Sequence, residues 1–159
     1  MASSRRRIPI LMRVPVPWVF VLAYLVGLGL QAFVPIALAP EIRQVARIIG
    51  WVLLSAGVAV AAWSLVLFRT ARTTTIPFEE PSALVVSGPY RLSRNPMYLA
   101  LTLAYLGEAA ILGQVWPLVP LVATFVYVNW TVIPFEERRL QETFGDAYAR
   151  YRVTVRRWL

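Results

Sequence analysis

The sequence lacks several residue types on which many enzymes rely for their chemistry. It contains no cysteine and no histidine, which excludes disulfide bonds and thiolate catalysis and removes the commonest general base and metal ligand. It also contains no lysine, so all 16 basic residues are arginines and Schiff-base chemistry is excluded. Any chemistry must come from carboxylates, tyrosine, arginine, asparagine, hydroxyl groups, the backbone or a bound cofactor.

Charge is scarce as well. Only 15% of the 159 residues are charged, 58% are hydrophobic, and the mean hydropathy is +0.62. In a soluble domain, roughly a quarter of the residues are charged. The charges here lie between long uncharged runs, and we therefore predict an integral membrane protein.

Four apolar runs predict the fold, namely residues 18–39, 45–68, 97–112 and 115–133. The first is about long enough to cross a bilayer core of ~30 Å, and we expect its helix to kink or end near Pro35. Residues 40–44 read as a short connection, and Gly113 begins a tight turn that joins the last two runs into a hairpin. The prediction is an all-α integral membrane protein with four transmembrane helices, forming one membrane domain over residues 1–159. Residues 1–68 form its N-terminal helical pair.

The polar segments complete this picture. Residues 69–87 are predicted as a cytoplasmic loop. After the fourth run, Pro134, Glu136 and Glu137 suit the first turn of a helix. Gly145 followed by Asp146 is typical of a helix stop and a new N-cap. We therefore expect two short cytoplasmic helices that lie against the membrane face.

The arginines predict the orientation. Four precede the first run, four lie between the second and third runs, and six lie in the tail, whereas two, Arg43 and Arg47, lie at or just after the first connection and none at the third. Positive segments stay on the cytoplasmic side, so four crossings place both termini in the cytoplasm and the protein in the cell (inner) membrane. Juxtamembrane arginines attract anionic lipids, and we expect no nucleic-acid partner and no metal.

Two polar clusters meet at the cytoplasmic end of the hairpin. One is GPYRLSRNPMY, residues 88–98, whose two prolines indicate a rigid turn. The other is the pair Glu136 and Glu137. Each has a simpler interpretation by itself, the first as an interfacial anchor of Tyr and Arg and the second as a source of weak surface salt bridges. Their convergence on one end of the hairpin favours a functional site.

The clusters also carry a family resemblance. GPYRLSRNPMY, an apolar hairpin, then PFEERRLQETFGDAYARY and a final Arg-Trp-Leu resemble the isoprenylcysteine carboxyl methyltransferase and phospholipid N-methyltransferase superfamily. The resemblance covers roughly residues 69–159. It implies a methyltransferase core there, with S-adenosylmethionine entering from the cytosol. It also implies a lipophilic or lipid-anchored acceptor that arrives through the bilayer.

The motifs carry site residues with them. Tyr90, Arg94, Asn95, Pro96 and Tyr98 match the family's Arg-His-Pro-x-Tyr region, and Glu136 and Glu137 match its paired glutamates. The resemblance implies that the cofactor is bound by residues of these two clusters: Gly88, Pro89, Tyr90, Asn95, Pro96, Tyr98 and Glu136. Arg94 and Glu137 are the predicted catalytic residues, and Arg94 or Arg91 is expected to hold an anionic group. Asn95 stands where many relatives have histidine, and it cannot shuttle a proton near neutral pH.

Glu108 is a separate candidate, which we add to the catalytic residues. It lies within the third apolar run, where a carboxylate is costly and often functional. It either contacts the head group of the acceptor or reaches water at the far end of a short helix.

Several alternatives stay open. One is an NADPH-dependent membrane enzyme of the sterol-reductase type, and another is a non-enzymatic transporter or membrane module centred on Glu108. The acceptor is also open, since an isoprenylcysteine carboxylate, an amine lipid, a quinone-like lipid or a thiol would each suit a methyltransferase.

Overall fold

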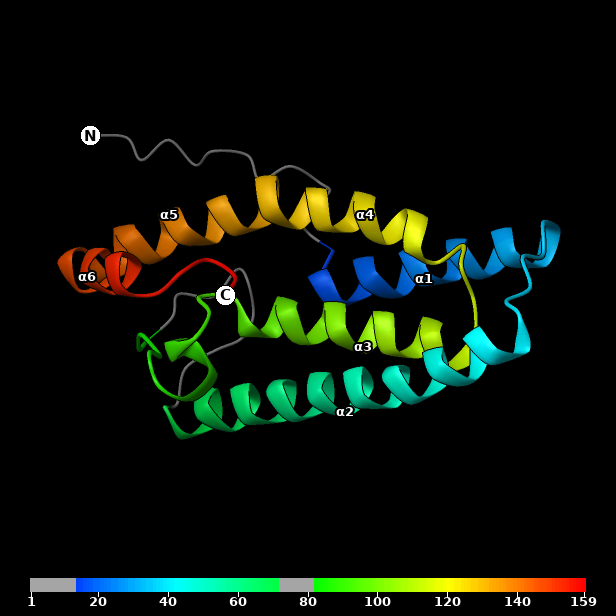
Figure 1. Ribbon diagram of the computed structural model, residues 1–159. Coiled ribbons are helices and arrows are strands. Elements are labelled where there is room, and N and C mark those ends of the chain that lie inside the picture. Colours follow the sequence, from blue (N-terminus) through cyan, green and yellow to red (C-terminus); the bar gives the residue numbers. More distant parts are fainter. Residues whose placement is uncertain (1–13, 72–81) are drawn as a thin grey trace.

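The computed structural model describes residues 14–71 and 82–159 (Figure 1). Arg5, Arg6, Arg7, Arg13 and loop residues 72–81 lie outside these ranges. Every regular element in the described part is helical, which confirms the all-α prediction. The elements are α1 (Val16–Phe33), α2 (Pro40–Thr70), the 3-10 helix η2 (Gly88–Arg91), α3 (Pro96–Leu112), α4 (Leu118–Tyr127), the π-helical turn η3 (Val128–Val132), α5 (Ile133–Phe144) and α6 (Asp146–Thr154).

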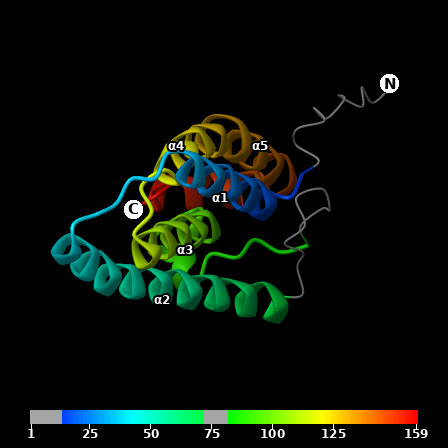
Figure 2. The same cartoon turned by 90° about the vertical axis from the view of Figure 1, so that its right-hand side faces the viewer.

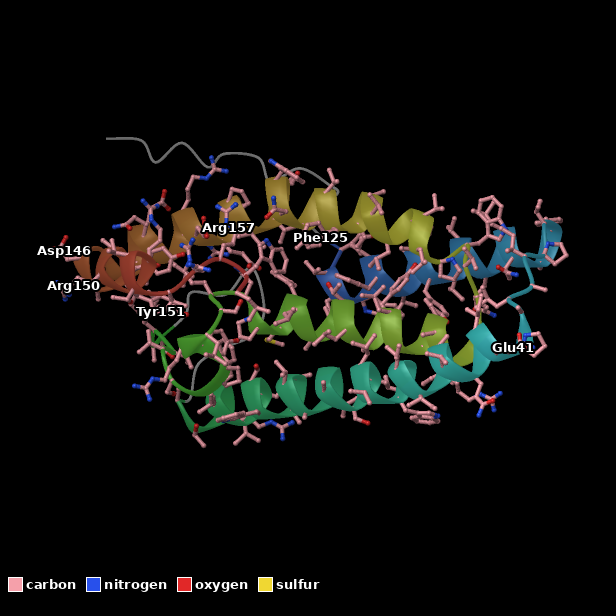
Figure 3. The ribbon with its side chains drawn as sticks, viewed as in Figure 1. Glu41, Phe125, Asp146, Arg150, Tyr151 and Arg157 are labelled. Carbon is pink, nitrogen blue, oxygen red and sulfur yellow. The ribbon has the colours of Figure 1, made fainter. Side chains whose placement is uncertain are left out.

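The long helices run alongside one another, with α3 in the middle. Figures 1 and 2 show α2 on one side of α3 and the pair α1 and α4 on the other. α2 ends, α3 begins and α6 folds back at the same end of the bundle (Figure 1). We call this end, which carries residues 88–98, the motif end, and the opposite one the far end. Figure 3 shows Glu41 at the far end and Asp146, Arg150 and Tyr151 at the motif end.

The outer surface has the character of a membrane protein. Three helical stretches are long and apolar enough to cross a bilayer: Val16–Phe33, Pro40–Thr70 and Leu118–Phe144. α3 is apolar too but has 17 residues. Large apolar side chains such as Trp51 and Val122 are more than half exposed, as expected for a surface that faces lipid. The number of crossings and their orientation stay predictions.

Small residues hold α3 against α2. Gly50, Gly57 and Ser64 recur every seventh residue and are the buried positions of α2. A Cβ on Gly57 would lie 2.7 Å from the carbonyl oxygen of Ala100, and one on Gly107 would lie 2.6 Å from the backbone nitrogen of Leu54. Small residues of this kind let helix backbones approach closely within a membrane. The contact fixes α3, and with it the motif residues at the start of α3, against α2.

The first connection differs from the prediction. Residues 40–44 are helical and open α2, whereas α1 ends at Phe33, two residues before Pro35. Proline suits the first turn of a helix because its missing N–H needs no partner there, and Glu41 favours the positive end of the helix dipole. The connection is therefore residues 34–39.

The tail differs as well. Residues 133–144 do not form a separate short helix, because α4, η3 and α5 join into one helix over Leu118–Phe144. Pro134 would break a regular α-helix, but it directly follows the π-helical turn η3, where the backbone hydrogen bonds are already rearranged. The helix stop at Gly145 is confirmed, with φ +49°. The predicted N-cap at Asp146 is wrong, because Gly145 itself is the N-cap of α6 and Asp146 is the first residue of that helix.

The close approach of α2 and α3 predicts an asymmetry between two glycines. In Gly57→Ala the new methyl group would clash with backbone atoms of α3, and we expect a loss of about 1–3 kcal/mol despite the higher helix propensity of alanine. Gly29→Ala is the matched control, because a Cβ at Gly29 meets nothing within 4 Å. Thermal unfolding of the detergent-purified variants measures the difference. Equal melting temperatures for both variants would contradict this account of the packing.

Candidate active site

The turn before α3 is held by α2 and α6. Gly88 has φ +58° and lies so close to Trp63 and Leu67 that a side chain would not fit. Tyr90 is buried; its ring packs edge-on against Phe68, with centroids 5.6 Å apart. The Tyr151 hydroxyl donates a hydrogen bond of 2.7 Å to the Tyr90 carbonyl oxygen.

Burial also raises the pKa of both phenols, Tyr90 and Tyr151, so both remain neutral at physiological pH. Of the predicted cofactor residues, Gly88 and Tyr90 thus make structural contacts inside the protein, and Pro89 is buried beside them.

The residues just before α3 pair with residues 155–159. The Asn95 side chain donates a hydrogen bond of 3.0 Å to the carbonyl oxygen of Arg157, and the Ser93 hydroxyl donates one of 3.1 Å to the same oxygen. The backbone N–H of Arg94 donates to the carbonyl oxygen of Arg156, at 3.0 Å. Pro96 is almost fully buried at the first position of α3. Asn95, predicted to face the cofactor, is thus engaged with the chain itself.

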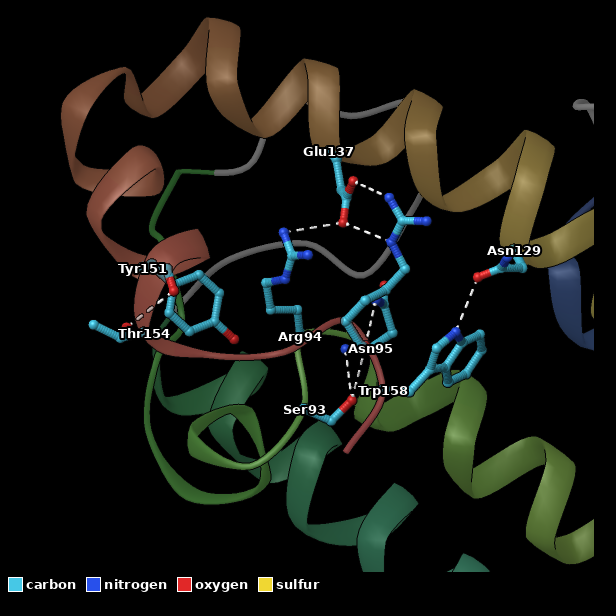
Figure 4. A network of polar contacts seen from close by, with 9 residues as sticks. Ser93, Arg94, Asn95, Asn129, Glu137, Tyr151, Thr154 and Trp158 are labelled. Carbon is cyan, nitrogen blue, oxygen red and sulfur yellow. Dashed lines mark hydrogen bonds and ion pairs between the residues drawn. The ribbon is translucent and has the colours of Figure 1, made fainter.

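A carboxylate shared by two arginines lies above this turn (Figure 4). Glu137 Oε2 lies 2.7 Å from Arg157 Nη2, and Arg157 Nε donates to Glu137 Oε1 at 3.2 Å. Arg94 Nη1 lies 3.1 Å from the same Oε1. The side chains of Arg94 and Glu137 are only 11% and 12% exposed. The three groups carry one negative and two positive charges, so the cluster retains a net positive charge.

Arg94 has unused hydrogen-bonding capacity. Its Nε and Nη1 atoms are buried and form no hydrogen bond with the described residues, because the contact of Nη1 with Glu137 is an ion pair without hydrogen-bond geometry. Tyr148, which is 1% exposed, lies against Arg94, whose charge and side-chain hydrogen bond lower the pKa of Tyr148, whereas burial, the largest effect, raises it. A buried donor without a partner costs free energy, so an acceptor group that reached Arg94 Nε would be stabilised there.

Glu136 pairs with Tyr98 instead of with Arg94. The Tyr98 hydroxyl donates a hydrogen bond of 2.5 Å to Glu136 Oε1. Residues 118–135 contain no charge, so Glu136 directly follows the uncharged, apolar part of its helix. Burial raises the pKa of Glu136 to about 7; the hydrogen bond from Tyr98 and the charge of Arg139 act in the opposite direction. This carboxyl group therefore exchanges its proton near neutral pH.

Glu108 lies apart from the other candidates. It is exposed and lies twelve residues along α3 from Pro96, about 18 Å at the rise of an α-helix. It interacts electrostatically with Tyr24 of α1. An open cavity of about 430 Å³ also lies towards the far end, lined by Leu38, Pro40, Arg43, Gln44, Arg47 and Ile48. The structure thus brings Arg94, Tyr98, Glu136 and Glu137 together and leaves Glu108 out.

Three residues that complete the motif end were not predicted from the sequence. Arg157 binds Glu137, and the Trp158 indole N–H donates to Asn129 Oδ1 at 2.9 Å. Trp158 also stacks on Phe125, with ring centroids 4.9 Å apart. Asn129 lies in η3, and π-helical turns are frequent at functional sites. The Arg-Trp pair at the end of the sequence was the one available signal, and it pointed to no partner.

The family model described as phospholipid methyltransferase matches residues 45–147, more than half of the chain. The chain belongs to this family. The match confirms the superfamily predicted from the two motifs, and it makes the protein a membrane methyltransferase by family. It contains Arg94, Tyr98, Glu136 and Glu137, and it begins within α2, earlier than residue 69, where the motif resemblance starts.

The chain is also similar to a curated protein over part of its length. An uncharacterized protein of Haemophilus influenzae is 38% identical to this chain over 63 residues, which are 40% of this chain and 100% of the relative. No solved structure matches the chain.

The raised pKa of Glu136 predicts a pH-dependent effect of Glu136→Gln on stability. The folded protein holds the Glu136 proton up to about pH 7, whereas the unfolded chain releases it near pH 4.5, so the wild type loses stability as pH rises between these values. Glutamine cannot ionise, so Glu136→Gln does not lose stability in this way. The melting temperature of the variant should therefore rise relative to that of the wild type from pH 5 to 8, by about 2–4 °C for each kcal/mol of difference in stability.

The exposed Glu142 on α5 provides the control for this experiment. Glu142→Gln should follow the wild-type melting curve at every pH. If the Glu136→Gln and wild-type curves also ran in parallel, Glu136 would not have a raised pKa.

Proposed function

We propose that this protein transfers a methyl group from S-adenosylmethionine to a lipophilic acceptor at the cytoplasmic face of the inner membrane. The observation that carries the proposal is Arg94, a buried guanidinium with an unpaired Nε, close to two carboxylates within the family-matched region. The arginine distribution along the sequence supports a cytoplasmic motif end and cytoplasmic termini.

The residues at the motif end fit the chemical groups of the cofactor. Its carboxylate matches Arg94 Nε, since guanidinium–carboxylate hydrogen bonds are strong. Its amino group and ribose hydroxyls match the Glu136 carboxyl group, which Tyr98 orients. Glu137 is already bonded to two arginines; in this proposal it acts by holding Arg94. Gly88, Pro89, Tyr90, Asn95 and Pro96 shape the wall behind these side chains.

The proposed chemistry needs alignment more than a strong base. When bound, S-adenosylmethionine supplies a methyl group on a positively charged sulfur, which an acceptor atom takes in an in-line displacement. The residues of the chain orient the reacting groups and exclude water. A carboxylate or thiolate acceptor needs no base, whereas an amine acceptor must lose a proton. In this proposal Glu136 takes that proton, because burial raises its pKa to about 7, near the pH at which the reaction runs.

An amine-bearing phospholipid is the acceptor we propose first. The family is described as phospholipid methyltransferase, and the chain has a candidate proton acceptor in Glu136. Glu108 is too far along α3 to act in the same step, and its exposure favours the interpretation that it reaches water at the far end.

Binding of S-adenosylhomocysteine tests the cofactor and its residues. In calorimetric titration of detergent-purified protein, the wild type should bind saturably, and Arg94→Ala and Glu136→Ala should each bind at least about tenfold more weakly, as expected for the loss of a hydrogen bond to a charged group. Arg138→Ala is the control for Arg94→Ala, and Glu142→Ala is the control for Glu136→Ala, because each removes the same side chain from an exposed position of α5. Both control variants should bind S-adenosylhomocysteine as the wild type does. Well-folded wild type that binds nothing would overturn the proposed cofactor, and equal binding by all variants would overturn the residue assignment.

The acceptor is tested by transfer of a labelled methyl group. Wild-type protein in vesicles that contain an amine lipid should produce a labelled lipid, and vesicles of a quaternary-amine lipid should give none, because that nitrogen cannot accept a further methyl group. Labelling of an isoprenylcysteine carboxylate or a small thiol instead would replace the amine lipid as acceptor while leaving the methyltransferase in place.

A further inference from the structure

Residues 155–159, which we call the strap, return from the end of α6 across the motif end. Figure 1 shows this segment in red, running back from α6 towards the start of α3. The strap lies outside the family-matched residues 45–147. Its contacts with the site therefore belong to a part of the chain that the family assignment does not cover.

The strap is anchored on both sides of Arg157. On one side, the carbonyl oxygens of Arg156 and Arg157 accept hydrogen bonds from Arg94, Ser93 and Asn95. On the other side, Trp158 bonds Asn129 and stacks on Phe125, as Figure 4 shows for the hydrogen bond. With the backbone fixed before and after it, the Arg157 side chain is directed at Glu137.

Arg157 makes more contacts with the Glu137 carboxylate than Arg94 does. It contacts both oxygens, at 2.7 and 3.2 Å, whereas the contact of Arg94 with Oε1 is an ion pair without a hydrogen bond. A guanidinium and a carboxylate otherwise favour a two-point, parallel pairing. Because Arg157 occupies that geometry, Arg94 retains an unpaired Nε and the cluster retains a net positive charge.

We propose that Arg157 is a positioning residue that keeps Arg94 available for the carboxylate of the bound nucleoside. The inference rests on the proposed function. Without Arg157, Arg94 and Glu137 would form a neutral pair, and Arg94 would be drawn into two-point contact with Glu137. The site would then lose its attraction for an anionic group while the surfaces for the rest of the ligand stayed in place.

Two ligands that differ in the amino-acid part test this proposal. S-adenosylhomocysteine carries the carboxylate and the amino group, and 5′-methylthioadenosine has the same nucleoside without either. We expect Arg157→Ala to weaken the binding of S-adenosylhomocysteine by roughly tenfold, the scale of one hydrogen bond to a charged group. The dissociation constant of 5′-methylthioadenosine should stay within about threefold of the wild-type value. A general loss of structure would weaken both ligands together, so the ratio of the two dissociation constants is the decisive readout.

Arg156→Ala is the matched control. It removes the same charge from the adjacent strap residue, whose exposed side chain forms no ion pair within residues 14–71 and 82–159. The ratio should stay at the wild-type value. Arg157→Lys keeps the charge without the two-point geometry, and its ratio should lie between those of the wild type and Arg157→Ala. If Arg157→Ala does not fold, as judged by melting and elution in detergent, the lysine variant decides the question.

The outcomes separate the inference from the function on which it rests. Wild-type protein that binds neither ligand would overturn the proposed function. Wild-type binding of both ligands, with an unchanged ratio in a folded Arg157 variant, would overturn the role of Arg157 and leave the proposed function standing.

Discussion

One carboxylate, Glu137, joins three parts of the chain that are distant in sequence. It lies on α5 and pairs with Arg94 from the turn before α3 and with Arg157 from the strap. A buried carboxylate without its partners would carry a large desolvation cost, and each arginine would likewise be left with an uncompensated charge. The three segments therefore hold their places together, and the shape of the motif end depends on this shared charge.

The second constraint is the glycine-mediated contact of α2 with α3. Burial of apolar surface contributes little to helix association in lipid, because the lipid tails are apolar too. Helices in a membrane therefore associate mainly through close packing of their backbones. Gly50, Gly57 and Gly107 allow that packing, and it extends along α3 to the residues that precede Pro96. Because α3 is held in this way, its residue Tyr98 lies within hydrogen-bonding distance of Glu136. The glycine contacts between α2 and α3 therefore help to set the distance between these two side chains in the polar site.

The absence of histidine agrees with this architecture. A site built from arginines, carboxylates and tyrosines can hold, orient and shield its ligands. Among its carboxyl groups, Glu136 has a pKa that burial raises to about 7. The proposed methyl transfer from a sulfonium places modest demands on proton chemistry, which is consistent with such a set of residues.

Much of the protein was predictable from its sequence because the signals are local. Apolar runs predict helices and a membrane, the proline and glycine positions predict where helices begin and end, and two short motifs carry the family. The strap was not predictable, since its hydrogen bonds join residues more than sixty positions apart and depend on where α6 turns. The same holds for the continuous helix over Leu118–Phe144, where a π-helical turn accommodates Pro134. Residue types determined which interactions were possible; tertiary packing decided that Glu137 takes Arg157 as its two-point partner and leaves Arg94 with an unpaired donor.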